Sequence, residues 1–209
     1  MNINIDSLIF DLDGTLWDAV DTLVLSCNDV LKNHPDIKKK FSRKDFESVM
    51  GMQLDDISKK FFTNLNETDR NIIMKEFCIA EQNSLAQNGG KLYPNLEETL
   101  LKLSRKFKLF IVSNCQVGYI ETFLKYHKLE KYFIDFENPG RTNLSKGENI
   151  NLIIKRNNLK NPVYVGDTTS DLEAAKFANI PFIYANYGFG NVNEYDYAIN
   201  NIEDLLNFK

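Results

Sequence analysis

Hydrophobic and polar positions divide the chain into stretches of different pattern. Near the N-terminus the run Leu8–Phe10 is short and apolar, and acidic residues and a glycine stop it, which predicts a buried strand that ends on a loop. Residues 17–88 repeat apolar side chains at helical spacing, whereas residues 94–209 alternate short apolar runs with helical patterns. Alternating strands and helices are typical of a parallel sheet with helices on both faces. We therefore predict a protein of the α/β class.

The stretch at residues 17–88 reads as almost wholly helical, with no convincing strand. Within it, Ser42 and Asp45 fit a capping box, and Gly51 interrupts the helix that they begin. The expected helices lie at residues 18–33, 42–50, 55–62 and 68–86. Because this stretch separates the first strand from all the others, we expect it to be an insertion in a core formed by residues 1–16 and 89–209.

Polar residues follow several of the predicted strands at the point where each strand ends. They are Asp11 and Asp13, Ser113 and Asn114, and Gly166 and Asp167. Because ligands bind at the carboxyl ends of strands in an open parallel sheet, we expect these residues to converge at one site, with Lys146 from the start of a helix. The carboxylates of Asp11 and Asp13 point the same way and repel each other, unless a cation, a proton or a reacting centre uses them. This edge of the sheet is therefore the candidate active site.

Composition and charge exclude some classes of protein. The 209 residues are 43% hydrophobic and 26% charged, as in ordinary globular proteins, and the net charge of −4 favours neither nucleic acid nor an anionic membrane as a partner. The cysteines Cys27, Cys78 and Cys115 fit neither metal-ligand spacing nor a disulfide framework, so we expect reduced, mostly buried thiols. We find no secretion signal and no run of membrane-spanning length. We expect a cytoplasmic protein that is a monomer or a weak homodimer.

Four short motifs follow one another in a set order along the chain. They are Asp11 to Thr15 (DLDGT), Ser113, Lys146, and Gly166 to Asp171 (GDTTSD). This set resembles the phosphatases of the haloacid dehalogenase superfamily, which carry D-x-D-G-T, then Ser or Thr, then Lys, then G-D-x-x-x-D. The stretches Tyr93 to Asn95 and Tyr187 to Gly190 resemble its phosphoglycolate-phosphatase-like branch. The resemblance covers essentially the whole chain and implies a Rossmann-like core, with residues 17–88 as a helical cap domain.

The resemblance also implies an activity and a set of functional residues. It implies a Mg²⁺-dependent phosphatase that hydrolyses a small phosphorylated metabolite, such as a phosphoglycolate-like compound, a sugar phosphate or a nucleotide. Asp11 is then the nucleophile that forms an aspartyl phosphate, Asp13 the general acid and base, and Lys146 a catalytic cation. The implied magnesium ligands are Asp11, the main-chain carbonyl of Asp13, Asp167 and Asp171. The implied phosphate-binding and substrate-binding residues are Ser113, Asn114, Lys146, Thr15 and Gln53.

Alternatives stay open for particular residues. Lys146 is followed by Gly147, where many close branches have proline, which leaves Lys155 and Lys160 as weaker alternatives for the motif lysine. The loop around Gly51 resembles the loop that related caps point into the active site, but a plain helix break explains it equally well. Arg141 either binds a second anionic group of the substrate or is solvated.

Alternatives also stay open for the function. A phosphomutase and a nucleotidase of the same superfamily fit the same residues. A low-turnover binding or regulatory module is the alternative from another class, but such a module has no physical need for several mutually repelling carboxylates in one place. Asp13 argues against carbon–halogen cleavage, because the dehalogenases of the superfamily lack this second aspartate.

Overall fold

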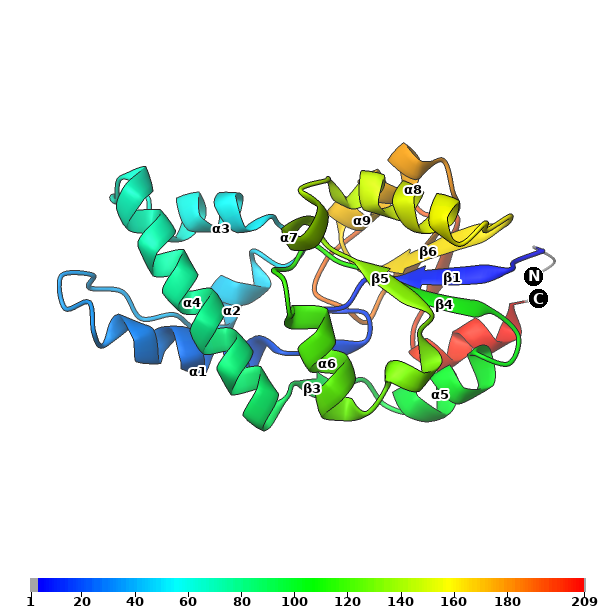
Figure 1. Ribbon diagram of the computed structural model, residues 1–209, viewed down its shortest axis with the longest axis horizontal. Helices are drawn as coiled ribbons and strands as arrows, with labels where there is room; N and C mark the ends of the chain where they lie inside the picture. Colours follow the sequence, from blue (N-terminus) through cyan, green and yellow to red (C-terminus); the bar gives the residue numbers. More distant parts are fainter. Residues whose placement is uncertain (1–3, 209) are drawn as a thin grey trace.

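A sheet of six parallel strands forms the centre of the protein, whose computed structural model describes residues 4–208 (Figure 1). The strand order is β5-β4-β1-β6-β7-β8, and all neighbouring pairs are parallel. The strands are β1 (Ser7–Phe10), β4 (Lys108–Val112), β5 (Asp135–Glu137), β6 (Pro162–Gly166), β7 (Phe182–Ala185) and β8 (Tyr197–Ile199). Because β1 lies between β4 and β6, with Phe10 opposite Ile111 and Val165, the ends of these strands lie side by side.

Helices cover both faces of this sheet. Side chains alternate along β1, so that Leu8 and Phe10 pack in one apolar cluster and Ile9 packs in the other. The first cluster includes residues of α5 (Leu96–Leu103) and α6 (Tyr119–His127), and the second includes residues of α8 (Lys146–Arg156) and α9 (Thr169–Ala178). The shorter elements are the helix α7 (Pro139–Thr142) and the 3₁₀ turns at Glu130–Tyr132 and Ile202–Asn207. The predicted α/β class, with helices on both faces of a parallel sheet, is confirmed.

In the sequence, a block of helices separates β1 from the other strands of the sheet, and in space this block lies beside the sheet, on the left in Figure 1. The helices are α1 (Val20–Leu31), α2 (Arg43–Glu47), α3 (Leu54–Phe61) and α4 (Glu67–Asn88). The predicted capping box of Ser42 and Asp45 is present at the start of α2. The interior of the block is rich in phenylalanine, and Phe41 has edge contacts with Phe46 and Phe77. Hence residues 20–88 have a buried apolar interior, which is continuous with the apolar cluster on the first face of the sheet. Their role as a cap stays a prediction.

The structure corrects the expectation that residues 17–88 contain no strand. The two segments that connect the helical block to the sheet pair as a short antiparallel ribbon, in which β2 (Trp17–Asp18) pairs with β3 (Lys91–Leu92). Each of these strands has 2 residues, too few to show an alternating pattern. The short elements β8 and α7 were also missed. β8 has 3 residues and pairs with the edge of β7, which is a tertiary contact that local pattern does not reveal.

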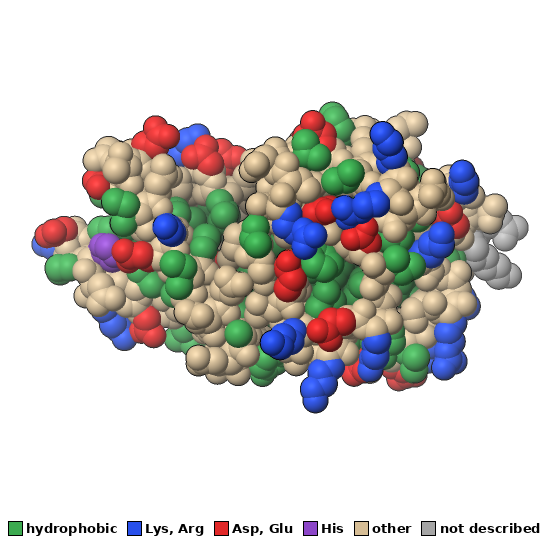
Figure 2. Space-filling view, in the orientation of Figure 1, with side chains coloured by type: hydrophobic (Ala, Val, Ile, Leu, Met, Phe, Trp, Pro, Cys, Tyr) green, Lys and Arg blue, Asp and Glu red, His purple; other side chains and the backbone are tan. Residues whose placement is uncertain are grey.

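The surface charges, the hydropathy of the helices and the cysteines bear on earlier expectations. On the face that Figure 2 shows, basic and acidic side chains are interspersed over both halves of the molecule. A search of the helices within residues 4–208 finds none with the length and hydropathy that a membrane span requires. The cysteines Cys27, Cys78 and Cys115 are free, and the first and last of them are buried, as expected.

Trp17 anchors the ribbon to the core. It is the only tryptophan of the sequence, its side chain is 0% exposed, and its ring meets Tyr119 and Phe123 edge-on with centroid distances of 5.8 and 4.9 Å. The backbone of Gly90 lies so close to this ring that an added Cβ would stand 2.7 Å from Cε3 of Trp17. Trp17 therefore fixes where the helical block leaves the sheet.

We expect Trp17→Ala to lower the free energy of unfolding by about 3–5 kcal/mol, since it removes a large buried side chain and leaves a cavity. Leu25→Ala is the matched control, because Leu25 is 68% exposed and its loss should change this free energy by less than about 0.5 kcal/mol. Urea unfolding followed by circular dichroism measures both values. Equal effects of the two substitutions would contradict this role of Trp17.

Candidate active site

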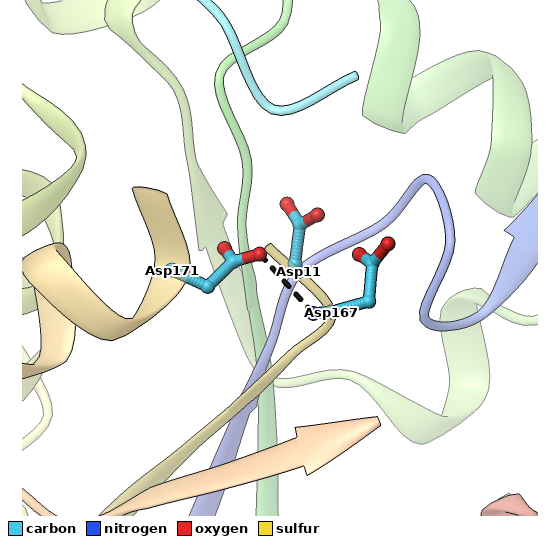
Figure 3. Close-up of side chains that lie close together, drawn as sticks. All are labelled: Asp11, Asp167 and Asp171. Carbon is cyan, nitrogen blue, oxygen red and sulfur yellow. Dashed lines mark hydrogen bonds between the residues drawn. The ribbon is translucent and has the colours of Figure 1, made fainter. Parts of the chain in front are cut away.

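Three buried aspartates meet where β1 and β6 end. Asp11 follows β1, and its backbone N–H donates to the carbonyl oxygen of Val165 over 2.8 Å, which extends the ladder with β6 by one residue. Asp167 follows β6, and Asp171 lies in the first turn of α9. One carboxylate oxygen from each residue lies within 4.8 Å of the others, and Figure 3 shows the side chains converging from these elements. The sheet topology thus brings together aspartates that are up to 160 positions apart in the sequence.

Lys146 is the lysine that the structure brings to this cluster. It occupies the first position of α8, which Ser145 and Glu148 cap with a capping box. Its ammonium group donates to Oδ1 of Asp11 over 2.8 Å and to Oδ1 of Asp171, and its side chain is only 3% exposed. The alternatives Lys155 and Lys160 are both exposed on the surface. The geometry therefore favours Lys146 as the motif lysine.

The cluster carries more negative than positive charge in a buried place. Burial and the carboxylate of Asp171 raise the pKa of Asp11 to about 6, although Lys146 acts in the opposite direction. Burial, Asp171 and Asp11 raise the pKa of Asp167 well above its usual value. Burial alone would lower the pKa of Lys146, but Asp11 and Asp171 outweigh it and raise that pKa, so the lysine stays charged. Three carboxylates against one ammonium leave room for a further cation.

Asp171 is held by donors on both carboxylate oxygens. Its Oδ2 accepts from the backbone N–H groups of Asp167 and Thr168 over 3.2 and 2.9 Å, and from the Thr168 hydroxyl over 2.7 Å. Its Oδ1 accepts from Lys146 and from the Tyr164 hydroxyl, the latter over 3.2 Å. Figure 3 marks the bond between Asp167 and Asp171. These contacts orient Lys146 and the loop that carries Asp167, and the expected role of Asp171 as a metal ligand stays a prediction.

The donor set fits a hard divalent cation. Among the residues that the structure describes, two donors reach the carboxylate of Asp167, the Thr15 hydroxyl over 3.4 Å and the backbone N–H of Phe189 over 2.7 Å. The backbone of Gly14 passes so close that an added Cβ would lie 2.2 Å from Oδ2 of Asp167, and Gly14 has a φ of 83°, which favours glycine. Oxygen ligands and an uncompensated negative charge are what a divalent metal ion requires. The acidic group can therefore hold such an ion.

Asp13 lies beside this cluster in a different environment. Its Oδ1 accepts a hydrogen bond from the hydroxyl of Tyr119 over 3.0 Å. Burial and the nearby charge of Asp11 raise the pKa of Asp13 to about 8, against the smaller opposing effect of Tyr119. Asp13 thus carries a proton near neutral pH, whereas Asp11 is mostly ionised, which separates a proton donor from a nucleophile.

A cavity of about 80 Å³ extends from Asp11 and Asp13 toward the helical block. Ser113 and Asn114 line it at the end of β4, as the sequence predicts. The loop around Gly51 also lines it, and the side-chain amide of Asn114 donates to the carbonyl oxygen of Gly51 over 3.0 Å. This loop therefore enters the site and is more than a helix break.

The other expected binding residues lie outside this cavity. Gln53 lines the two clefts beside it and precedes α3 as its N-cap. Thr15 is 0% exposed, and its hydroxyl points to Asp167. Arg141 donates to Glu137 and Glu121 over 3.1 and 3.2 Å, so its guanidinium is already paired at the surface. For these residues the structure places the side chain behind or beside the site.

Some residues that contact or line the site were not predicted from the sequence, among them Tyr119, Tyr164 and Glu81. Both tyrosines lie among apolar residues in the sequence, so the pattern indicates core packing. Both residues do belong to the apolar clusters of the core. Glu81 interrupts the apolar face of α4. A charged residue on a buried face is the sequence feature that could have indicated a functional role for Glu81.

Comparison with known proteins identifies the family. A sequence profile described as haloacid dehalogenase-like hydrolase matches residues 8–185. The chain belongs to this family. The match includes Asp11 after β1, the whole helical block, and Ser113 and Asp167 after β4 and β6.

Relatives of this haloacid dehalogenase-like hydrolase extend over nearly its whole length. A phosphoglycolate phosphatase of Vibrio parahaemolyticus is 25% identical to this chain, and the alignment covers 97% of this chain and 95% of the relative. Another, from Aquifex aeolicus, is 27% identical and covers 95% of this chain and 94% of its own length. The crystal structure of a predicted phosphoglycolate phosphatase from Haemophilus somnus shares the fold, with a TM-score of 0.85, 23% identity and 99% of both chains covered. These findings confirm the phosphoglycolate-phosphatase-like branch and indicate a phosphatase.

We expect Asp171→Asn to lower the free energy of unfolding by about 2–4 kcal/mol. The substitution replaces one carboxylate oxygen by an NH₂ group, which is a donor and would face either the Lys146 ammonium or the backbone N–H groups. Glu148→Gln is the control. Glu148 and Asp171 both occupy the N3 position of a capping box, but Glu148 is exposed. Its effect should stay below about 1 kcal/mol. Urea unfolding at pH 7 compares them, and a neutral or stabilising Asp171→Asn would refute this role.

Proposed function

We propose that the protein is a magnesium-dependent phosphatase that hydrolyses a small phosphorylated metabolite through an aspartyl phosphate on Asp11. The observation that carries this proposal is the placement of Asp11 and Asp13 on the wall of one cavity, with Lys146 bonded to Asp11. The names of the relatives, phosphoglycolate phosphatase, support a small phosphate monoester as the substrate class.

Asp11 is the nucleophile in the proposed reaction. Its ionised carboxylate attacks phosphorus and forms the aspartyl phosphate, while the bond to the leaving oxygen breaks. Asp13 gives its proton to that oxygen, and the alcohol departs. Asp13 is then a carboxylate and takes a proton from the water that attacks phosphorus. The bond between phosphorus and the Asp11 oxygen breaks, so phosphate leaves with Asp11 ionised and Asp13 protonated again. The different pKa values of Asp11 and Asp13 suit this division of roles.

Fixed donors and cations stabilise the charge that spreads over the phosphoryl oxygens. The Lys146 ammonium, the Ser113 hydroxyl and the main-chain amide of Asn114 supply these groups in the proposal. Asp11, the main-chain carbonyl of Asp13, and Asp167 would hold the magnesium ion, which would supply positive charge to the phosphoryl oxygens. Asp171 contributes by holding Lys146 in place and is the weakest candidate for a further ligand.

Residues 17–88 act as a cap in this proposal. The cap excludes bulk water from the aspartyl phosphate and contacts the leaving group through the loop around Gly51. The β2–β3 ribbon and the adjoining glycines Gly89 and Gly90 form the hinge. Gly89 has a φ of 65°, which a residue with a side chain rarely adopts.

The direct test of this proposal is to trap the intermediate. We expect the wild type, mixed with Mg²⁺ and 4-nitrophenyl [³²P]phosphate and quenched in acid, to carry a hydroxylamine-labile label on the peptide that contains Asp11. Asp11→Asn keeps the shape of the side chain without the nucleophile, so it should carry no label and lose at least about 10³-fold in kcat. Turnover by the wild type with no label, or a label elsewhere, would contradict the proposal.

A second prediction isolates the proton given by Asp13. We expect Asp13→Asn to lower kcat/KM for an alkyl phosphate by about 10²–10⁴-fold. The loss should be much smaller with 4-nitrophenyl phosphate, because 4-nitrophenolate leaves without being protonated. Steady-state kinetics with both substrates measures the two losses, and kcat/KM does not include the later hydrolysis of the intermediate. Equal losses would show that Asp13 is not the general acid.

A further inference from the structure

The part of the cavity that faces away from the aspartate cluster is mainly apolar. Its walls come from the helical block and include Leu23, Phe46, Val49, Ile57, Met74 and Phe77. In the proposed function the phosphoryl group binds at Asp11, so this apolar part would receive the leaving alcohol. Its chemistry therefore determines which phosphate esters fit.

Glu81 is the charged side chain on this apolar wall. It projects from α4, the residue is 9% exposed, and it lines the cavity together with Asp13. The same cavity is lined by Tyr119, which donates to Asp13, so Glu81 lies on the side of the general acid. The leaving oxygen must be on that same side in order to receive the proton of Asp13.

The carboxylate of Glu81 has few donors for a buried group. The Cys27 thiol donates to Oε1 and the side-chain amide of Gln116 donates to Oε2, each over 3.3 Å. A thiol is a weak donor, and a carboxylate can accept about four hydrogen bonds. Burial raises the pKa of Glu81 to about 7, against the smaller opposing effects of Cys27 and Gln116, as expected for a carboxylate without a strong partner. Glu81 can therefore accept a further donor from a bound molecule.

The cavity offers little to a second anionic group. Within residues 4–208, its lining contains no lysine, arginine or histidine. Of its polar side chains, Asn114 donates to Gly51, Gln116 to Glu81, and Tyr119 to Asp13. The Ser113 hydroxyl, which also lines the cavity, serves the phosphoryl group in the proposed function. A carboxylate on the leaving group would lie beside Glu81 in apolar surroundings, where like charges repel strongly.

We propose that Glu81 selects phosphate monoesters whose leaving alcohol is short and carries a hydrogen-bond donor, with an ammonium group best and a second anion worst. This inference rests on the proposed phosphatase function and narrows its substrate class to esters of amino alcohols. It separates this chain from the activity in the names of its relatives, because phosphoglycolate carries a carboxylate in the position that would face Glu81.

Four phosphate esters of similar size test this selection. They are 2-aminoethyl phosphate, 2-hydroxyethyl phosphate, propyl phosphate and 2-phosphoglycolate, which differ in the group that faces Glu81. We expect kcat/KM to fall in that order, by about tenfold or more between the aminoethyl and the propyl ester, and further for phosphoglycolate. 4-Nitrophenyl phosphate measures whether the enzyme is active at all.

Glu81→Gln keeps the size and the hydrogen-bonding shape of the side chain and removes the charge. We expect this substitution to lower kcat/KM for 2-aminoethyl phosphate by about tenfold and to leave kcat/KM for propyl phosphate within about twofold of the wild type. It should raise kcat/KM for phosphoglycolate. Glu76→Gln is the matched control on the same helix, because Glu76 pairs with His34 outside the cavity, and it should preserve the wild-type order.

The outcomes separate this inference from the proposed function. Phosphoglycolate as the best of the four esters, no difference among them, or 4-nitrophenyl phosphate as the only substrate would overturn the role of Glu81 and leave the phosphatase intact. A Glu81→Gln variant that loses activity equally on all four esters would also overturn it, because that result indicates a structural glutamate. Failure to hydrolyse any of the esters, 4-nitrophenyl phosphate included, would contradict the proposed function.

Discussion

The site depends on the balance of charge around the buried ammonium group of Lys146. Without this cation, the carboxylates of Asp11, Asp167 and Asp171 would lie together in the protein interior with no positive charge among the described contacts. Burying charges costs free energy, and removing one partner of a buried pair costs more than the pair contributes. The topology offsets this cost by placing Lys146 among the carboxylates, because the ends of β1 and β6 and the starts of α8 and α9 lie together. The remaining negative charge makes the site attractive to a metal ion.

Much of this arrangement could be predicted from the sequence, and the reason is local. A short apolar run that stops at Asp11 or at Asp167 marks a strand end, and the parallel topology then brings such ends to one edge. The same logic placed Ser113 and Asn114 on the cavity wall. Recognising Lys146 depended on family resemblance, because a lysine at a helix start is otherwise an ordinary surface residue.

The features that escaped prediction arise from tertiary contacts. The ribbon of β2 and β3 joins segments more than 70 positions apart and is too short to leave a pattern. Tyr119 and Tyr164 have core-like positions, and only their hydroxyl groups, which reach Asp13 and Asp171, reveal their part in the site. The apolar wall and Glu81 come from helices whose sequence pattern indicates the packing of the block itself. The pattern therefore predicted the reacting groups better than the part of the cavity that selects the alcohol.

The crystal structure of the protein with Mg²⁺ and orthovanadate tests the central claim most directly. The account predicts one metal ion that is bound by the carboxylates of Asp11 and Asp167, vanadium next to Asp11, and Lys146 still bonded to Asp171. A metal ion bound elsewhere, or vanadate in the cavity away from Asp11, would contradict it.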